Sequence, residues 1–516
     1  MELKDKQQRS PREARVGDRV KPVARPKEKI QQQQSGDTAI ILGALHESLT
    51  LTSLLCLKKY YLCHFAEEGE VAEESAIPTD LETWIKNNAK DLKIRLKDRR
   101  WAAEVVNDFR ENLLKFLNNE PLFKSAECLN AGSYFEKVKI HMPDEFDMML
   151  TFPGSPNLRL NPMKLDGGLF YRLDLTRPNR QPIKAFLLEN SLTLSSSKVL
   201  NEMHRLVRKF LKTYKVPDEC YRWEVNRKRV YSPAVTLSLF KTDKNSEELI
   251  SVDVVPALEV QSWPAAVRNG PDVSNWLGKK ALQDIRSLPC YFVPKRQKGR
   301  NLGEDAKESW RISFSHIEKK IITSHGNKKT CCESHATKCC RKRCLMLLKS
   351  LIEGLKQRFP EELNGLCSYH GKTTFLHTLS TRYDDAKWNP QHLSVCFLYL
   401  VRALEDYASR GNLPHFFAPE CNLFSPSSFS RKALAFLVNA LKEQRREGLP
   451  LLKPPALVPP LMPPLMPRED LDETCNETFE ERSFVLVHFV DAALINKLGV
   501  AFTVLVGYAF YILLSC

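Results

Sequence analysis

A cluster of histidine and cysteine residues between positions 325 and 339 constrains the fold more than any other feature of the chain. His325, Cys331, Cys332 and Cys339 could supply one imidazole and three thiolates to a closed tetrahedral zinc site. Zinc would fold a short Gly- and Lys-containing loop that could not fold by itself, and soft ligands with no open position indicate a structural role. Reduced surface cysteines are the alternative, because the spacing differs from the common finger patterns. Three further candidate ligands lie close by in sequence: His335, Cys340 and Cys344.

The zinc cluster lies inside the most basic part of the chain. The formal net charge of the 516 residues is +15, and residues 295–349 contain fifteen Lys and Arg against five Asp and Glu. A solvated charged face is the usual explanation of such a run, but its coincidence with a metal cluster favours binding to a phosphate backbone. The fifteen cysteines have no paired spacing, which fits a reducing compartment such as the cytosol or the nucleus.

Periodicity predicts an α+β protein with a mixed sheet, a long spine helix and a helical C-terminal lobe. Apolar residues recur at helical spacing between 79 and 117, strand patterns alternate with turns over 130–260, and 340–450 is mostly helical. The predicted regions are a basic disordered tail with an unassigned segment (1–78), a core with the spine helix (79–260), a helical lobe (261–448) that holds the zinc insertion (325–339), a Pro-rich linker and acidic segment (449–498), and an uncharged end (499–516).

The uncharged C-terminal stretch is eighteen residues long and could form a membrane anchor. A buried terminal helix is an equal alternative. The proline run before it, with eight prolines in residues 449–467, favours an extended linker at which the folded body ends.

Three acidic residues predict the chemistry. Glu145 and Asp147 are two positions apart on a predicted strand, so both carboxylates project from one face. Asp253 lies on the polar face of a second strand, in a predicted hairpin. Gly132-Ser133 precedes them, and a glycine turn lets backbone N–H groups and a hydroxyl approach a triphosphate. Together these residues predict phosphoryl transfer with two magnesium or manganese ions held by hard oxygen ligands.

The same residues carry a family resemblance. Gly132-Ser133, Glu145-x-Asp147 and Asp253 resemble the catalytic signature of the Mab-21-type nucleotidyltransferases, and the His-x5-Cys-Cys-x6-Cys insertion narrows the resemblance to the vertebrate branch that forms cyclic GMP-AMP. The similarity extends from about residue 80 to about residue 448. It includes, in the same order, Ser-Pro-Ala-Val-Thr at 232–236, Ser-Trp-Pro at 262–264, Trp-Arg-Ile-Ser-Phe-Ser-His-Ile-Glu-Lys at 310–319 and Asn-Leu-Phe-Ser at 422–425.

The resemblance implies an enzyme of innate immunity and antiviral defence. It implies a bilobal catalytic core that binds double-stranded DNA as a homodimer and joins ATP and GTP through mixed 2′-5′ and 3′-5′ linkages. The implied metal ligands are Glu145, Asp147 and Asp253 for magnesium and His325, Cys331, Cys332 and Cys339 for zinc. The implied nucleotide-binding residues are Gly132, Ser133, Lys295, Arg311, Ser313, Ser315, Glu318, Lys349, Ser368 and Tyr369. The implied DNA-binding residues are Lys93, Lys319, Lys328, Lys329, Arg341 and Lys342.

Two departures from the family pattern concern loops near the predicted site. Ala131 stands where the family commonly has a hydroxyl residue, and Val230-Tyr231 replaces a glycine pair. Two other functions stay open on sequence alone: a relative that senses double-stranded RNA, and a catalytically silent Mab-21-type protein that binds nucleic acid or a partner. Loss of a metal carboxylate would favour the silent protein, and absence of the zinc insertion would favour the RNA sensor. The sequence retains all three carboxylates and the zinc insertion.

Overall fold

The computed structural model describes most of the chain between residues 77 and 452. The described ranges are 77–152, 158–177, 183–189, 191–243, 246–260, 263–264, 273, 276–297, 303–323, 325–326, 331–332 and 338–452. The expected basic tail, Pro-rich linker and C-terminal anchor therefore lie outside the described residues, apart from a few positions at their edges. Lys328, Lys329 and His335 also lie outside them. Within these ranges, no helix combines the length and apolar character needed to cross a bilayer.

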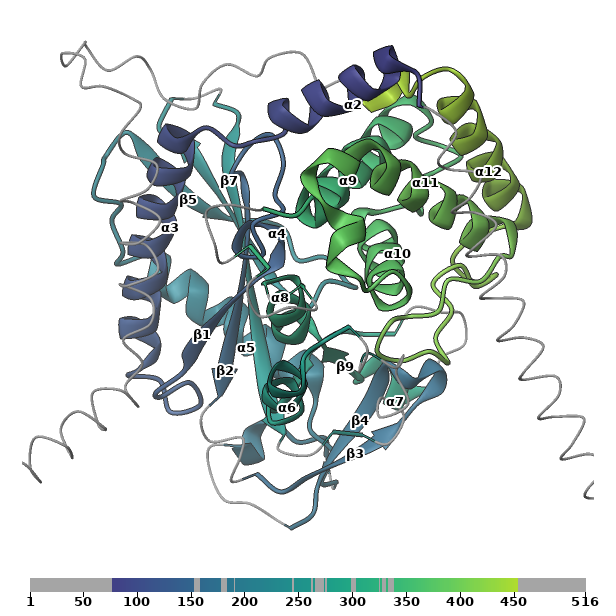
Figure 1. The fold of residues 1–516 in the computed structure, drawn as a ribbon. Coiled ribbons are helices and arrows are strands. Elements are labelled where there is room, and N and C mark those ends of the chain that lie inside the picture. Colours follow the sequence, from purple (N-terminus) through teal and green to yellow (C-terminus); the bar gives the residue numbers. More distant parts are fainter. Residues whose placement is uncertain are drawn as a thin grey trace, which may run out of the picture. The chain divides into compact units, whose positions relative to one another are not determined.

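A mixed β-sheet forms the centre of the described part, as the sequence predicts. Its strands are β1 (Glu127–Ala131), β2 (Glu145–Phe152), β3 (Leu160–Lys164), β4 (Phe170–Leu175), β5 (Tyr221–Val225), β6 (Val235–Lys241), β7 (Glu248–Val260), β8 (Cys290–Val293) and β9 (Trp310–Ser313). The main order is β1-β2-β7-β8-β9-β4-β3, and β6 joins β5 to β7 (Figure 1). The β2–β7 pair is parallel, whereas the other pairs are antiparallel.

Helices surround the sheet and form the C-terminal part. The α-helices are α2 (Thr79–Asp91), α3 (Leu96–Leu117), α4 (Gly132–Phe135), α5 (Ser196–Leu211), α6 (Lys279–Arg286), α7 (Glu304–Lys307), α8 (Ser315–Thr323), α9 (Arg341–Arg358), α10 (Ser368–Thr381), α11 (Leu393–Ser409) and α12 (Arg431–Arg446). Short 3-10 turns occupy Asp166–Gly168, Ile183–Phe186, Asp385–Trp388, Pro390–His392 and Pro450–Leu452.

One face of the sheet packs on α3 and α5. Alternate residues of β7, Ile250, Val252 and Val254, are fully buried, as expected for the apolar face of a strand. Phe109 of α3 contacts the ring of Phe210 on α5 edge-on, with 5.8 Å between the ring centroids. Because this face is filled by apolar packing, the polar residues that alternate with it on β7 must project from the opposite face.

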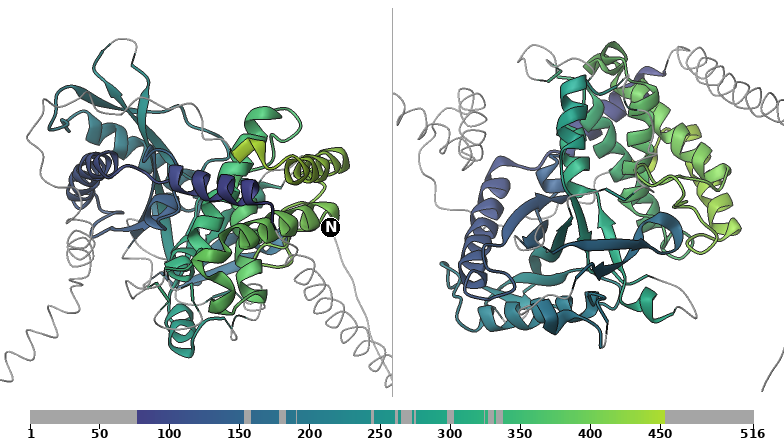
Figure 2. Two further views of the ribbon diagram at one scale, coloured as in Figure 1. Left: turned by 45° about the horizontal axis from the view of Figure 1, so that its top comes forward. Right: turned by 90° about the horizontal axis from the view of Figure 1, so that it is seen from below.

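The spine is two helices rather than one. The break lies between α2 and α3, and Lys93 is exposed within it. Helix α3 flanks the sheet, whereas α2 packs on α9 and α11 (Figures 1 and 2), and the Trp84 indole N–H donates to the Leu449 carbonyl at 3.0 Å. This segment therefore contacts both the sheet and the C-terminal helices.

The expected division at residue 260 does not coincide with the end of the sheet. Strands β8 and β9 follow that boundary, and they join the sheet through β7 and β4. Their residues are almost all buried, so the apolar runs that contain them could equally have been read as helix.

Candidate active site

The structure brings the three predicted carboxylates together on the open face of the sheet. Asp147 of β2 and Asp253 of β7 are direct neighbours in the parallel register, and Glu145 lies two positions before Asp147. Phe146 and Met148 are buried on the other face. The period of two in the strand therefore gives both the apolar packing and the row of acids.

Gly132 lies directly against this row. It follows Ala131, which pairs with Asp147 at the end of β1, and it begins the short helix α4. Its φ of +79° is in the left-handed region, and a Cβ built on it would lie 1.8 Å from Oδ2 of Asp147. Only glycine allows the backbone this approach, which explains the Gly-Ser pair in the sequence.

The acids repel one another. Partial burial raises the pKa of Asp147 to about 6, and the neighbouring charges of Asp253 and Glu145 act in the same direction. Lys139 contacts Glu145 at 2.6 Å and Asp144 at 2.8 Å, so it neutralises one end of the row. A crowded set of carboxylate oxygens, in which the pKa of Asp147 is raised, fits a site for divalent cations such as magnesium or manganese.

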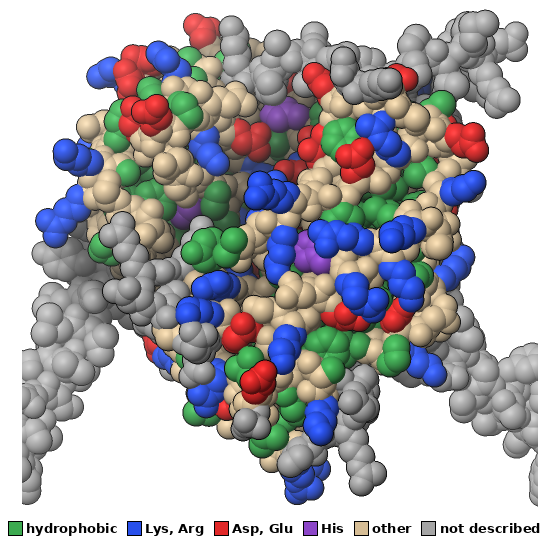
Figure 3. Space-filling model, turned by 180° about the vertical axis from the view of Figure 1, so that it is seen from behind, with side chains coloured by type: hydrophobic (Ala, Val, Ile, Leu, Met, Phe, Trp, Pro, Cys, Tyr) green, Lys and Arg blue, Asp and Glu red, His purple; other side chains and the backbone are tan. Residues whose placement is uncertain are grey.

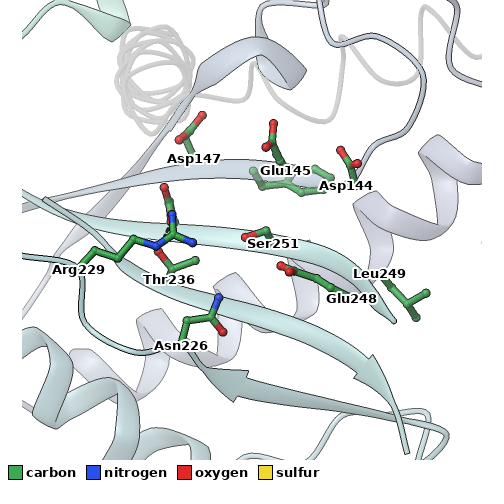
Figure 4. A pocket seen from close by; sticks show the side chains of 11 residues that line it. Asp144, Glu145, Asp147, Asn226, Arg229, Thr236, Glu248, Leu249 and Ser251 are labelled. Atoms are coloured by element: carbon green, nitrogen blue, oxygen red, sulfur yellow. Dashed lines mark hydrogen bonds between the residues drawn. The ribbon is translucent and has the colours of Figure 1, made fainter. Parts of the chain in front are cut away.

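A cavity of about 500 Å³ opens over the carboxylates (Figure 4). The Thr236 hydroxyl donates to Oδ1 of Asp253 at 2.6 Å, which fixes the orientation of that carboxylate. Thr236 pairs with Asp253 across β6 and β7. Sequence reasoning did not single out the other lining residues: Asp144, Phe146, Asn226, Arg229, Thr236, Glu248, Leu249 and Ser251. Register pairing of the predicted hairpin could have identified Thr236.

Several predicted nucleotide-binding residues form a second group beside the carboxylates. The Ser315 hydroxyl lies 3.9 Å from the sulfur of Met149, which follows Asp147 by two positions on β2. Ser313 and Ser315 are 3.1 Å apart between hydroxyl oxygens. The Tyr369 hydroxyl donates to Oε1 of Glu318 at 3.0 Å. Residues of β9, α8 and α10 thus converge here.

The remaining predicted nucleotide-binding residues surround this group. Lys349 is buried, its Nζ donates to the Val138 carbonyl at 3.0 Å, and burial lowers its pKa to about 8. Arg311 is half-buried on β9, Ser368 is the exposed first residue of α10, and half-buried Lys295 follows β8.

Lys372 connects this group to the loop that follows α4, and the sequence did not indicate it. Its Nζ lies 2.7 Å from Glu136 and 3.0 Å from Glu318, and both carboxylates are almost completely buried. These charges and contacts raise the pKa of Lys372 well above its ordinary value, despite its burial. Tyr369 also contacts Nε2 of His415 at 2.8 Å. Buried side chains therefore link α10 to the segment after Gly132-Ser133.

The expected zinc ligands are gathered. The ligand atoms of His325, Cys331, Cys332 and Cys339 all lie within 4.8 Å of one another. His325 Nδ1 lies 2.7 Å from the Ile322 carbonyl, which leaves Nε2 toward the thiols, 3.2 Å from Cys339 Sγ. One imidazole nitrogen and three sulfurs suit a structural zinc ion. Among the described cysteines, Cys340 and Cys344 are buried outside this cluster.

The predicted DNA-binding residues have different environments. Lys93 is exposed, and Lys319 is half-buried on α8, with its Nζ donating to the Asn130 carbonyl at 3.2 Å. Lys342 is half-buried, and desolvation lowers its pKa. Arg341 is fully buried, so its placement does not fit the expected phosphate contact. Its guanidinium pairs with Asp385 at 2.8 Å and lies over the Trp388 ring.

One face of the surface is hollowed. Acidic and basic side chains border the hollow, and further Lys and Arg side chains lie beside it (Figure 3). Lys and Arg side chains are numerous beside the hollow on this face, and a few Asp and Glu side chains lie among them.

Comparisons with known proteins agree with this architecture. The Mab-21 protein nucleotidyltransferase domain matches residues 134–324, and the Mab-21 protein HhH/H2TH-like domain matches residues 340–443. Cyclic GMP-AMP synthase of Mus musculus is 39% identical over 370 residues, which cover 71% of this chain and 70% of that protein. Cyclic GMP-AMP synthase of Sus scrofa is 38% identical over 355 residues, 68% of each chain. A cyclic GMP-AMP synthase-like receptor of Magallana gigas is 26% identical over 351 residues, 63% of this chain and 52% of its own.

Proposed function

The chain belongs to the Mab-21 nucleotidyltransferase family, and on this premise we propose that it joins ATP and GTP into cyclic GMP-AMP when it binds double-stranded DNA. The observation that carries the proposal is the row formed by Glu145, Asp147 and Asp253 beside Gly132. The 38 and 39% identity to two cyclic GMP-AMP synthases supports this choice of product. The mixed 2′-5′ and 3′-5′ linkages are part of the proposal and follow from the resemblance of the sequence motifs.

The site residues suit transfer of a nucleotidyl group to a ribose hydroxyl. Glu145, Asp147 and Asp253 would hold two magnesium ions, which when bound neutralise charge on the reacting phosphates and the leaving pyrophosphate. Gly132 and Ser133 would cradle the donor triphosphate through backbone N–H groups and a hydroxyl. Oδ1 of Asp253 accepts the Thr236 hydroxyl, which leaves Oδ2 to receive the proton of the attacking ribose hydroxyl.

The second group of residues suits the nucleobases. The hydroxyls of Ser313 and Ser315 offer donors and acceptors to a base edge, and the Tyr369 ring offers an aromatic face. Both oxygens of Glu318 accept hydrogen bonds from this chain, from Tyr369 and Lys372. A base that contacts Glu318 would therefore share that carboxylate with these donors.

Lys319 supports a link between DNA and the active site. Its Nζ holds the carbonyl of Asn130, two residues before Gly132. A duplex phosphate that attracted this ammonium group would release the end of β1 and alter the Gly-Ser loop. Phosphate contacts of this kind depend on salt and carry no base sequence information. The zinc cluster would hold the adjacent loop in place for the same surface.

Product analysis tests the enzymatic proposal. Purified protein is incubated with ATP, GTP and magnesium, alone or with duplex DNA or duplex RNA, and the products are separated by chromatography. We expect cyclic GMP-AMP with DNA and none from a variant with Glu145→Gln and Asp147→Asn, which should still bind DNA. Activation by RNA alone would support the RNA-sensing alternative, and no product under any condition would support the silent one.

A charge reversal tests the proposed DNA surface. Lys319→Glu should weaken binding to duplexes of different sequence equally and reduce the salt dependence of binding. Lys432→Glu is the control, because Lys432 is an exposed lysine on α12. A loss that depends on base sequence would contradict the phosphate-contact interpretation.

The proposal extends to location and assembly. We propose a cytosolic and nuclear protein that forms a homodimer on DNA. Membrane contact through residues 499–516 stays a prediction from an uncharged stretch. Fractionation of cells that express the tagged full-length chain into cytosolic, nuclear and membrane fractions would test these locations.

A further inference from the structure

The cavity over the carboxylates contains one basic side chain among its described lining residues, Arg229. The titratable residues that line the rest of the cavity are all acidic: Asp144, Glu145, Asp147, Glu248 and Asp253. Figure 4 shows Arg229 beside Thr236, extending into the cavity. Despite these acids, the guanidinium group of Arg229 forms no ion pair within 4.0 Å and no hydrogen bond to any residue that the structure describes, and only its backbone carbonyl accepts a hydrogen bond, from the Ser232 N–H at 3.1 Å.

Sheet topology places Arg229 and Gly132 on opposite flanks of the carboxylate row. The strands run in the order β1, β2, β7, β6, β5, and Gly132 follows β1 whereas Arg229 lies in the connection from β5 to β6. Asp147 on β2 is the acid nearest Gly132, and Asp253 on β7 is the acid that Thr236 of β6 contacts. A ligand that crosses the row can therefore contact backbone N–H groups on one flank and a guanidinium on the other.

The chemistry of the proposed function requires a second polyphosphate position, and this inference rests on that function. In the first transfer, the acceptor hydroxyl oxygen bonds to the α-phosphorus of the donor, the bond from that phosphorus to pyrophosphate breaks, and the hydroxyl proton passes to a site carboxylate. The acceptor nucleotide keeps its own triphosphate, whose α-phosphorus is attacked when the ring closes and whose β- and γ-phosphates then leave as pyrophosphate. A second polyanion must therefore be held intact in a cavity with five acids.

We propose that Arg229 binds the triphosphate of the acceptor nucleotide during the first transfer. The guanidinium group can donate two parallel hydrogen bonds to phosphate oxygens, which a lysine cannot do. The donor triphosphate occupies the Gly132 flank, so the acceptor triphosphate takes the Arg229 flank. After the first transfer, the linear dinucleotide must turn over to bring its triphosphate to the Gly132 flank, and Arg229 then has no phosphate to bind.

The test compares Arg229→Ala with Arg227→Ala. Arg227 is an exposed arginine of the same loop that does not line the cavity, so it controls for the loss of one positive charge. The first transfer is measured with ATP as donor and either GTP or GMP as acceptor, in the presence of activating DNA. Ring closure is measured separately with the linear dinucleotide 5′-triphosphate. Both arginines are exposed loop residues, so both variants should fold.

Arg229→Ala should lower kcat/KM for GTP as acceptor by roughly tenfold to a hundredfold, the loss of a charge-assisted contact. It should leave GMP incorporation and ring closure unchanged, and Arg227→Ala should leave all three unchanged. Two results would overturn this inference and leave the proposed function standing. One is an Arg229→Ala enzyme that still prefers GTP over GMP as strongly as the wild type, and the other is a variant whose ring closure is impaired as much as its first transfer. A wild-type protein that joins no nucleotides would overturn the proposed function and this inference with it.

Discussion

Replacement of Lys372 by methionine should destabilise the protein through two buried carboxylates. Lys372 is the cation shared by Glu136 and Glu318, at 2.7 and 3.0 Å. The exposed fractions of the two acidic side chains are 0% and 6%, so water cannot replace the lysine. One oxygen of Glu136, Oε2, already has no hydrogen-bond partner among the described residues. Lys372→Met would leave both acids without their shared ion-pair partner.

The cost follows from the burial. Removal of one partner from a buried ion pair typically costs about 3–5 kcal/mol, because an uncompensated charge remains. The methionine side chain fills most of the lysine volume, so cavity formation adds little. We therefore expect the free energy of unfolding of Lys372→Met to fall by about 3–5 kcal/mol near pH 8, a large fraction of the stability of an ordinary domain.

The pH dependence gives the prediction its sign. Without Lys372, burial should raise the pKa of both carboxyl groups in the folded state above the ordinary value of about 4.3. A carboxyl group whose folded pKa is raised binds more protons in the folded state, so stability increases as the pH falls. In the wild-type protein, by contrast, Lys372 and Tyr369 hold the pKa of Glu318 below its ordinary value despite its burial. The free energy of unfolding of the variant should therefore lie closer to that of the wild type at pH 5.5 than at pH 8.

Urea unfolding followed by circular dichroism at the two pH values measures this effect. Lys320→Met is the matched control, since Lys320 is an exposed lysine on α8, the helix that carries Glu318. The control should change stability by less than about 0.5 kcal/mol. A deficit below about 1 kcal/mol for Lys372→Met at pH 8, or one that is the same at pH 5.5, would refute the argument from buried charge.

Three further predictions concern single residues. Gly132→Ala should abolish nucleotide transfer and lower the unfolding temperature, because its φ is +79° and a Cβ would meet Asp147 at 1.8 Å; a fully active variant in the synthesis assay would contradict this. Cys331→Ser should lose the zinc that elemental analysis is expected to detect, whereas the exposed Cys220→Ser should retain it; equal zinc content in both would mean that other ligands bind the metal. Lys349→Met should stabilise the protein at pH 7 by up to roughly 3 kcal/mol, because burial lowers the pKa of this lysine from 10.5 to about 8 and so penalises the charged form. The gain in stability should disappear above pH 10.5. Urea unfolding at about pH 7 and about pH 11 measures this, and the same stability difference at both pH values would contradict the prediction.

The sequence predicted the parts of the site that depend on local pattern. Glu145 and Asp147 share a face because a strand has a period of two, and Asp253 could be placed because its hairpin partner is close in sequence. The requirement for glycine at position 132 was also predictable, since a turn residue followed by serine precedes the acids. These features need only the geometry of one strand or one turn.

Contacts between distant segments could not be predicted in the same way. Lys372 lies 236 residues from Glu136, and nothing in the local sequence of either residue identifies the other. The position of Arg229 depends on the placement of β5 and β6 beside β7, which no single strand pattern specifies. The break between α2 and α3 was open on sequence alone, because the apolar spacing allowed one helix or two.

The count of basic residues around the zinc cluster overstates the charge available to a polyanion. Arg341 contributes to the excess in residues 295–349, yet it is fully buried and its charge is compensated by Asp385. Its guanidinium also lies 3.5 Å from Cys331 Sγ, so it supports the metal cluster from within the fold. A charge reversal at Arg341 would therefore disrupt packing as well as any DNA contact, and a loss of binding there would not identify a phosphate ligand. Lys319, half-buried and in contact with the segment before Gly132, gives the cleaner test of the coupling between DNA and catalysis.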